Sequence, residues 1–482
     1  MLTTFLLLVA PVLAPNQGPI PSNGEGDLSG IEEIRADRIR ADLFFFADDA
    51  MRGRDTPSPE QRIAARYLRA RLERLGFTPG AGASFFFEYA LARKKVDPER
   101  SFLGLSGPGG TERLVFGEDY FISSSRYAGD GSFSGPVRFL GEASKEACEA
   151  ASLPGAWGVT VDDGGSILRR ARNAERSGAS GLIVLTDPAS GLDPFPVRFR
   201  KTTELAKSGV SSPRIGARSK RAFFPVYYLS KTGTEALLAA AGSADLAGLA
   251  SGLDLRVESE QVGDEETVLE DVCALWPGSD PRLRDEVLIV SAHYDHVGVR
   301  DGEIYNGADD NGSGSMGLLA IAEALAARGP LRRSVMLVWV SGEEKGLWGS
   351  AAWTEAPTLP AGTQAICDLN IDMIGRNAPD HLLITPTRDH PASNWLSRLV
   401  TRLSPLEGFP RLGSADEYWA RSDHMNFSQN LKIPVAFLFS GEHEDYHRPT
   451  DTPDKIDCDK VARVARLVFR VLVNLQGDTL PS

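Results

Sequence analysis

The strongest constraint on the fold is an alternation of strand-like and helix-like segments from residue 259 to the C-terminus. Buried-type strands are predicted at 286–292, 334–340, 366–371 and 433–439, and helices at 313–327 and 461–475. Parallel strands need crossover connections, which are usually helices. The order therefore predicts an α/β fold in which a mainly parallel mixed sheet is sandwiched by helices. A helix at 58–76 and a strand at 84–90 give the N-terminal part the same texture.

The middle of the chain has a different texture. Between about residues 116 and 258, short strand-like runs are separated by Gly, Ser and Pro, with one helical stretch at 166–177. We therefore predict a main domain in two parts, 31–115 and 259–482, interrupted by a small β-rich insert at 116–258. The insert should have its own core and join the main domain through two nearby crossings.

The N-terminus carries a short apolar run, FLLLVAPVLA, at residues 5–14. It is too short to span a bilayer and is typical of a secretory signal segment, here 1–15, followed by a polar linker at 16–30. The alternative is a buried or frayed apolar terminus. We expect export to the periplasm, the cell surface or the medium, and no other membrane span, because no later segment reaches 18 uninterrupted apolar residues.

Composition excludes several classes of protein. Asp and Glu outnumber Lys and Arg by 65 to 52, a net charge of −13, which argues against nucleic acid as the partner. The four cysteines, Cys148, Cys273, Cys367 and Cys458, lie far apart without CxxC spacing, so a thiolate zinc site or a redox dithiol is not expected.

Potential metal ligands follow the predicted strands. All seven histidines lie in the last 190 residues, and strand ends lead into AHYDH, SGEE, NIDMIG and SGEHEDYH, while GADDNGSG precedes a helix. Each motif alone has a structural explanation, such as a helix N-cap for Asp309 and Asp310. Ligands bind outside the carboxyl ends of strands in such sheets, and carboxylates that converge there need compensating cations. Imidazole and carboxylate donors without thiolates suit Zn²⁺, with Mn²⁺ or Co²⁺ as substitutes.

These motifs, together with GEEKGLWGS and DYHRPTDTPDKID, resemble the M28 family of co-catalytic zinc peptidases over about residues 30–115 and 259–475. The insert resembles a protease-associated (PA) domain in ARNAERSGASGLIVLTD and FPVYYLS. The resemblance implies a zinc-exopeptidase-like fold and two zinc ions per chain. The metal ligands that it implies are His293, Asp310 as the bridging carboxylate, Glu344, Asp372 and His447.

The same resemblance assigns three further roles. Asp295 would orient the His293 imidazole, Glu343 would act as general base, and Tyr446 would lie near the substrate carbonyl. It also implies a cis peptide bond between Asp310 and Asn311. His296, Asp309, His424 and His443 match no ligand position, so we expect them around the site or at the surface.

The activity implied is hydrolysis of peptide bonds in peptide or protein substrates, most simply by an aminopeptidase that releases N-terminal residues. One alternative is a carboxypeptidase or dipeptidase, for which Arg376 or Arg421 could grip a carboxylate. Another is a non-catalytic peptide-binding relative, which loss of ligands would mark. A cyclising acyltransferase of related fold would use a single zinc ion.

Overall fold

The structure, a computed structural model, describes residues 26–122, 131–187, 194–214, 224–249, 256–261 and 265–481. The predicted signal segment (1–15) and most of the polar linker (16–30) lie outside the described residues. No helix in the described ranges is long and apolar enough to cross a membrane. All four cysteines belong to the described part of the chain, where they are buried and form no disulfide.

The described chain divides into two compact units, which are considered separately. The first comprises residues up to Phe87, Asp271–Ser350 and the chain from Pro357 onward, and the second comprises Glu88–Glu270 and Ala351–Ala356. The boundaries cut two long strands, β2 (Phe86–Lys94) and β12 (Glu265–Trp276), and one helix, α10 (Trp348–Glu355).

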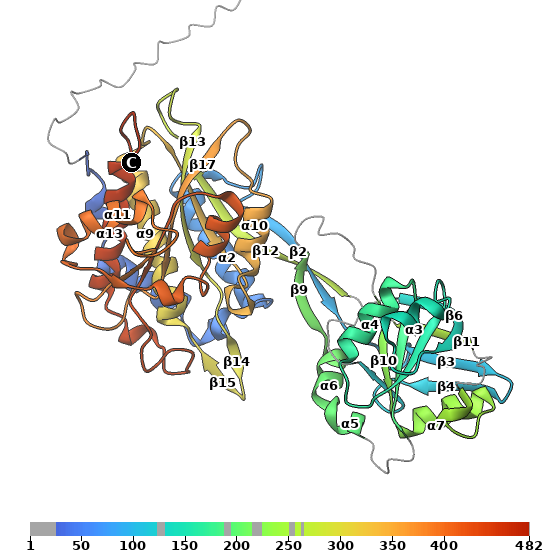
Figure 1. The fold of residues 1–482 in the computed structure, drawn as a ribbon. Helices are drawn as coiled ribbons and strands as arrows, with labels where there is room; N and C mark the ends of the chain where they lie inside the picture. The colour runs from blue at the N-terminus through green and yellow to red at the C-terminus, as the bar shows by residue number, and fades with distance from the viewer. Residues whose placement is uncertain are drawn as a thin grey trace, which may run out of the picture. The chain divides into compact units, whose positions relative to one another are not determined.

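The first unit contains a mixed sheet flanked by helices (Figure 1). Its helices are α1 (Ala36–Phe46), α2 (Pro59–Arg74), α9 (Gly314–Arg328), α11 (Trp395–Leu403), α12 (His424–Asn426) and α13 (Cys458–Asn474), together with the start of α10. Its strands, besides β2 and β12, are β1 (Thr78–Pro79), β13 (Glu286–His293), β14 (Gly298–Arg300), β15 (Glu303–Tyr305), β16 (Ser334–Val340), β17 (Gln364–Asp372), β18 (Leu383–Thr385), β19 (Gly413–Ser414) and β20 (Val435–Phe439).

The centre of this sheet is parallel. Strand β13 pairs in parallel with β16 and β17, and β17 pairs in parallel with β20. Strands β12 and β18 join antiparallel on either side. The strand order runs β19-β18-β20-β17-β13-β16-β12-β2-β9, where β9 is Val210–Arg214, with β1 on β12. The predicted mainly parallel mixed sheet is confirmed, with β16 at exactly the predicted residues.

Helices α9 and α13 lie side by side against the sheet (Figure 1), and α1 packs on both. Helix α9 is built from small and apolar residues and is buried from Gly314 to Leu325, because it lies between the sheet and its neighbours. Side-chain caps start several helices: Ser58 accepts a hydrogen bond from the Gln61 amide at the start of α2, and Asp457 accepts one from Lys460 at the start of α13.

The second unit has its own sheet and cores. Its sheet runs β4-β3-β11-β6-β7-β8-β10-β5, and two clusters of buried apolar residues cover it. The strands are β3 (Phe102–Gly107), β4 (Gly110–Val115), β5 (Tyr120–Ile122), β6 (Gly131–Phe139), β7 (Trp157–Val161), β8 (Gly181–Leu185), β10 (Val226–Leu229) and β11 (Arg256–Gln261), with β9 (Val210–Arg214) on β2. The helices are α3 (Lys145–Ala150), α4 (Ile167–Arg176), α5 (Pro194–Arg198), α6 (Arg200–Ser208), α7 (Lys231–Ala241) and α8 (Leu246–Leu249).

The predicted insert of 116–258 is too short at both ends. Strands β3 and β4, which we assigned to the main domain, belong to the second sheet, because β4 pairs with β3 and β3 pairs with β11. The chain also leaves the main domain within β2 and returns within β12, where no Gly or Pro cluster marks a boundary. The similarity of this unit to a PA domain stays a prediction.

Candidate metal centre

The carboxyl ends of the parallel strands meet at one edge of the first unit's sheet. His293 is the last residue of β13 and Asp372 is the last residue of β17. Glu343 and Glu344 begin a short helical turn just after β16. Gly342, the residue before this turn, has a left-handed backbone conformation with a φ of 70°. His447 lies in the loop that follows β20. Because neighbouring parallel strands end on the same side, their C-terminal residues come together.

Two groups of side chains form at this edge, and Asp310 belongs to both. His293 Nε2 lies 3.3 Å from Asp310 Oδ1 and 3.2 Å from Asp372 Oδ1. His447 Nε2 lies 3.1 Å from Asp310 Oδ2 and 3.1 Å from Glu344 Oε2. Asp310 therefore turns one carboxylate oxygen toward each group. The five residues predicted as ligands all lie together.

The spacing and chemistry of these atoms fit divalent cations. Tetrahedral zinc with bonds of about 2.0–2.2 Å places neighbouring ligand atoms about 3.3–3.6 Å apart. The four distances above lie between 3.1 and 3.3 Å, close to that spacing. His293, Asp310 and Asp372 are also buried, with at most 7% of each residue exposed. Buried carboxylates this close repel one another unless positive charge compensates them.

A network of hydrogen bonds holds the backbone turn that carries Asp310. Its segment, Ala308–Ser313, is a π-helical turn, and the Asp310–Asn311 peptide bond is cis, as predicted. The Asp451 carboxylate accepts hydrogen bonds from the backbone amides of Asp309 and Asp310. The Asn311 side chain donates to the Ile371 carbonyl and accepts from the Gly314 amide. These bonds tie the turn to β17.

The pKa values of the carboxylates at the site are shifted in opposite directions. Although burial raises it, hydrogen bonds from His293 and His447 hold the pKa of Asp310 well below its usual range. Burial raises the pKa of Glu343 well above its usual range, and the Glu344 charge raises it further. Adjacent Glu343 and Glu344 thus differ: Glu344 faces the imidazole groups, while Glu343 belongs to neither ligand group.

Asp295 contacts both His293 and Glu343. Its backbone carbonyl oxygen lies 3.2 Å from His293 Nδ1, whereas its carboxylate is 3.8 Å from that nitrogen. The carboxylate instead accepts a hydrogen bond from the Glu343 amide at 3.2 Å. The predicted orientation of His293 by Asp295 therefore runs through the backbone carbonyl in this structure.

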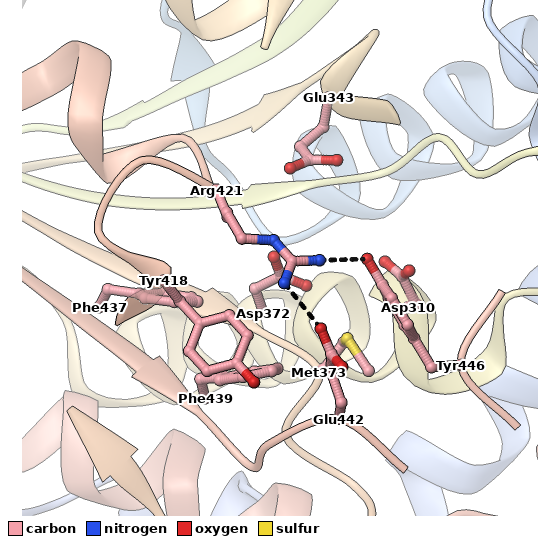
Figure 2. Close-up of a pocket in the computed structure, with 10 residues that line it drawn as sticks. All are labelled: Asp310, Glu343, Asp372, Met373, Tyr418, Arg421, Phe437, Phe439, Glu442 and Tyr446. Carbon is pink, nitrogen blue, oxygen red and sulfur yellow. Dashed lines mark hydrogen bonds and ion pairs between the residues drawn. The ribbon is translucent and has the colours of Figure 1, made fainter. Parts of the chain in front are cut away.

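A pocket opens beside the two groups (Figure 2). Asp310, Glu343 and Asp372 line it on one side, and the apolar side chains of Met373, Tyr418, Phe437 and Phe439 line it on another. Tyr446 stacks on His447 with ring centroids 4.0 Å apart and reaches the same pocket. Its hydroxyl accepts a hydrogen bond from Arg421 Nη2 at 3.4 Å.

The two arginines considered for carboxylate binding differ in position. Arg421 lines the pocket, where it pairs with Glu442 at 2.8 Å, and about half of its side chain is exposed (51%). Arg376 pairs with Asp445 at 2.8 Å and is not among the residues lining the pocket.

Two residues at the site, Ser422 and Arg54, were not singled out from the sequence, and His296 was expected only around the site or at the surface. His296 is fully buried, with Nδ1 2.8 Å from Glu344 Oε1. Ser422 donates to Asp372 Oδ2 at 2.9 Å, and the buried Arg54 donates to the Gly307 carbonyl just before the Asp310 turn. The AHYDH motif contained a signal for His296, whereas Arg54 lies about 240 residues away in sequence and has no local signal.

The other unassigned residues surround the site. His443 Nε2 lies 3.3 Å from Asp309 Oδ2, and the Asp309 Oδ1 atom accepts a hydrogen bond from the Gly375 amide. His424 is buried and stacks on Phe437 with ring centroids 4.6 Å apart. All three lie around the candidate metal centre, and that they are not ligands stays a prediction.

Comparisons with known proteins bear on the same segment. Residues 271–472 match the family model of peptidase family M28. The chain is 29% identical over 198 residues to a probable leucine aminopeptidase of Arthroderma otae, covering 39% of this chain and 54% of that protein. It is 33% identical over 205 residues to leupeptin-inactivating enzyme 1 of Streptomyces exfoliatus, covering 42% and 41%. A solved aminopeptidase from Aneurinibacillus sp. strain AM-1 aligns over 94% of this chain and 97% of its own, with 20% identity and a TM-score of 0.49.

The chain spans about half the length of the curated relatives it matches. The matched segment contains every residue predicted to bind metal. Residues 271–472 are therefore similar to peptidase family M28.

Proposed function

We propose that this chain is a metallopeptidase that holds two zinc ions and releases N-terminal residues from peptides. The observation that carries the proposal is the Asp310 carboxylate, whose two oxygens face separate groups of imidazole and carboxylate donors. His293, Asp310 and Asp372 would hold one ion, and Asp310, Glu344 and His447 the other. The match of residues 271–472 to the model of peptidase family M28 supports peptide hydrolysis, and the relatives' names as leucine aminopeptidases support action at the N-terminus.

The chemistry divides between the ions and the chain's own residues. Bound zinc supplies Lewis-acid polarisation and lowers the pKa of water. Glu343 lines the pocket without belonging to either ligand group, so its carboxylate can exchange a proton with a water molecule there. It accepts the proton of the attacking water and passes it to the leaving nitrogen.

Two further residues would act in this reaction. Asp295 holds the Glu343 backbone through its carboxylate and the His293 ring through its carbonyl, so it positions the base relative to a ligand. The Tyr446 hydroxyl reaches the pocket and would donate a hydrogen bond to the substrate carbonyl oxygen as negative charge develops there.

The pocket favours an apolar side chain in the substrate. Tyr418, Phe437 and Phe439 present rings beside Met373, and such walls gain free energy by burying apolar surface. We therefore propose peptides with large apolar N-terminal residues as the preferred substrates.

A two-part experiment tests the function. Metal analysis of the purified chain after zinc loading and dialysis should find two ions per chain, and a value near one would favour the single-zinc acyltransferase. Leucyl, glutamyl and N-acetyl-leucyl anilides are then compared, with and without chelator. We expect chelator-sensitive release from the leucyl compound only. Cleavage of the blocked compound alone would contradict the aminopeptidase.

The second candidate function is a carboxypeptidase or dipeptidase. Arg421 supports it, because a guanidinium that lines the pocket can grip a substrate carboxylate bidentately. Its pairing with Glu442 opposes it, since that carboxylate already occupies the guanidinium. Dipeptides and their C-terminal amides distinguish the two: only a carboxylate-dependent enzyme would reject the amides. A non-catalytic peptide-binding relative would turn over none of these compounds.

We also propose that the chain is exported, from the apolar run at residues 5–14. Fractionation of producing cells tests this. Protein found outside the inner membrane, with its first residues removed near Ala14, is the expected result, and full-length protein in the cytoplasm would contradict it.

A further inference from the structure

One buried histidine beside the site has no role in the proposed reaction. His296 is 0% exposed, and within the described residues neither of its ring nitrogens has a hydrogen-bond partner. Burying an unpartnered polar atom costs about 1–3 kcal/mol, so such a side chain is expected to serve a ligand or a function.

The Nδ1 atom of this ring points at the His447 group. It lies 2.8 Å from Glu344 Oε1 and 3.7 Å from Asp310 Oδ2. Across the described chain, Glu344 Oε1 also lacks a hydrogen-bond partner, so the 2.8 Å approach does not have hydrogen-bond geometry. A deprotonated ring nitrogen and a carboxylate oxygen this close repel each other unless positive charge compensates them, and a cation bound by both atoms would supply that charge.

The fold holds the ring in that position from several sides. The His296 amide donates to the Arg54 carbonyl at 3.3 Å, which fixes the backbone. A Cβ atom at Gly307 would lie 2.3 Å from His296 Cγ, so the ring packs directly against the backbone of this glycine. The imidazole therefore fits closely against residue 307, and a larger side chain at that position would occupy the space that the ring now fills.

We infer that His296 is a further ligand of the metal ion held by Asp310, Glu344 and His447. The ligand atoms of these four side chains all lie within 4.8 Å of one another. This inference rests on the proposed two-metal function and extends it. The ion at this position would have two imidazoles and two carboxylates, whereas the other would have the single imidazole of His293.

Two substitutions separate a ligand from a hydrogen-bond donor. In His296→Asn the side-chain amide can still donate to Glu344 from near the Nδ1 position, but it is a poor zinc ligand. In His296→Phe both capacities are lost. His424→Asn is the matched control, because His424 is equally buried, likewise lacks hydrogen-bond partners among the described residues, and belongs to neither ligand group.

Zinc affinity is measured by titrating each metal-free protein against a chromophoric chelator, with circular dichroism to verify folding. If His296 is a ligand, both variants should weaken one of the two binding steps by more than about 100-fold, beyond the 10–100-fold typical of an outer-shell residue. The other step and the control should stay within about threefold of the unmodified protein. Near-normal affinity in the Asn variant, with loss only in Phe, would overturn the inference in favour of a hydrogen bond.

The zinc-loaded crystal structure provides a second readout that does not depend on a variant folding. A ligand requires His296 Nδ1 at about 2.0–2.1 Å from the metal. A distance beyond about 3 Å would overturn the inference while leaving the two-metal function intact. Failure of the unmodified protein to bind any zinc would instead overturn the proposed function itself.

Discussion

Replacing Arg54 should damage both the stability of the chain and its metal site. Arg54 is fully buried and donates four hydrogen bonds to backbone carbonyls: to Tyr294 at 3.0 Å, Phe46 at 2.8 Å, Asn306 at 2.8 Å and Gly307 at 2.9 Å. Burial lowers its pKa to about 10, so the guanidinium remains a cation at neutral pH. Its positive charge also lies close to the carboxylates of the site.

The size of the loss follows from these bonds. Arg54→Met removes four donors at once, and at about 1 kcal/mol for each carbonyl left without its donor the free energy of unfolding should fall by about 4 kcal/mol. Zinc affinity should fall as well, because Arg54 fixes the carbonyls of Tyr294, next to His293, and of Gly307, just before the Asp310 turn. Arg54→Lys keeps the positive charge but loses the planar set of guanidinium donors. Its free energy of unfolding should therefore lie between those of the unmodified protein and Arg54→Met.

Urea unfolding of the metal-free protein measures this loss. Arg282→Met is the control, because the Arg282 side chain is 74% exposed and its ion pairs should contribute less than about 1 kcal/mol. If the free energy of unfolding falls no more in Arg54→Met than in the control, the proposal that Arg54 stabilises the contact between the segments at Phe46, Tyr294 and Gly307 is wrong.

Three further predictions concern the site. Glu343→Gln should keep metal and lower turnover by at least about 10²-fold, whereas Glu344→Gln should lose metal; near-normal turnover in the first would remove Glu343 from the mechanism. Burial lowers the pKa of His447, but hydrogen bonds to two carboxylates raise it to about 10 in the metal-free protein. Because a ligand imidazole must be neutral, zinc binding should release a proton at about pH 8, and calorimetry should see this release fade above about pH 10. A Cβ atom at Gly312 would lie 2.9 Å from Leu43 Cδ1, so Gly312→Val should weaken zinc binding without removing a ligand, and unchanged affinity would contradict this reasoning.

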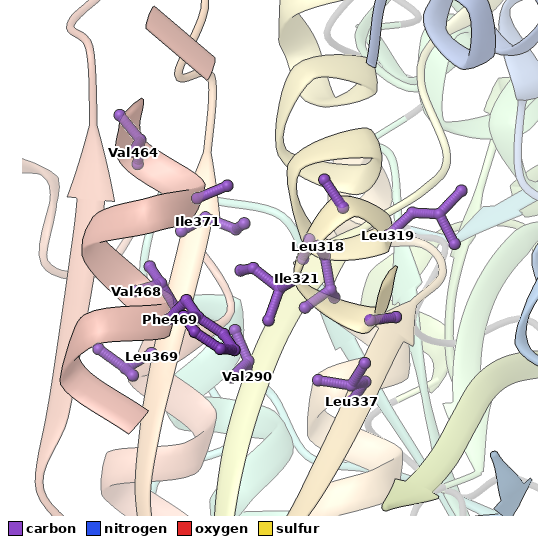
Figure 3. Packing of buried hydrophobic residues seen from close by; sticks show 14 of the residues in the cluster. Val290, Leu318, Leu319, Ile321, Leu337, Leu369, Ile371, Val464, Val468 and Phe469 are labelled. Carbon is purple, nitrogen blue, oxygen red and sulfur yellow. The ribbon is translucent and has the colours of Figure 1, made fainter. Parts of the chain in front are cut away.

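From the sequence alone we could predict the core of the first unit and which five side chains come together at the candidate metal centre. The apolar runs of β13, β16 and β17 bury Val290, Leu337 and Leu369, and Ile321 of α9 and Phe469 of α13 pack among them (Figure 3). Local periodicity predicts such elements because each must bury an apolar face. Since parallel strands end on one side, the candidate ligands that follow them were predicted to converge, and their side chains do lie together.

Only the tertiary structure decided which other polar residues belong to the site. Arg54 reaches Tyr294 and Gly307 across about 240 residues of chain, and His296 acquires its position from Gly307 and Glu344. The second unit's boundary is a similar case, because strand pairing assigned β3 and β4 to it. Composition and spacing report which face of an element is buried. Which distant group meets a buried polar atom depends on how the elements pack, and no local pattern encodes that.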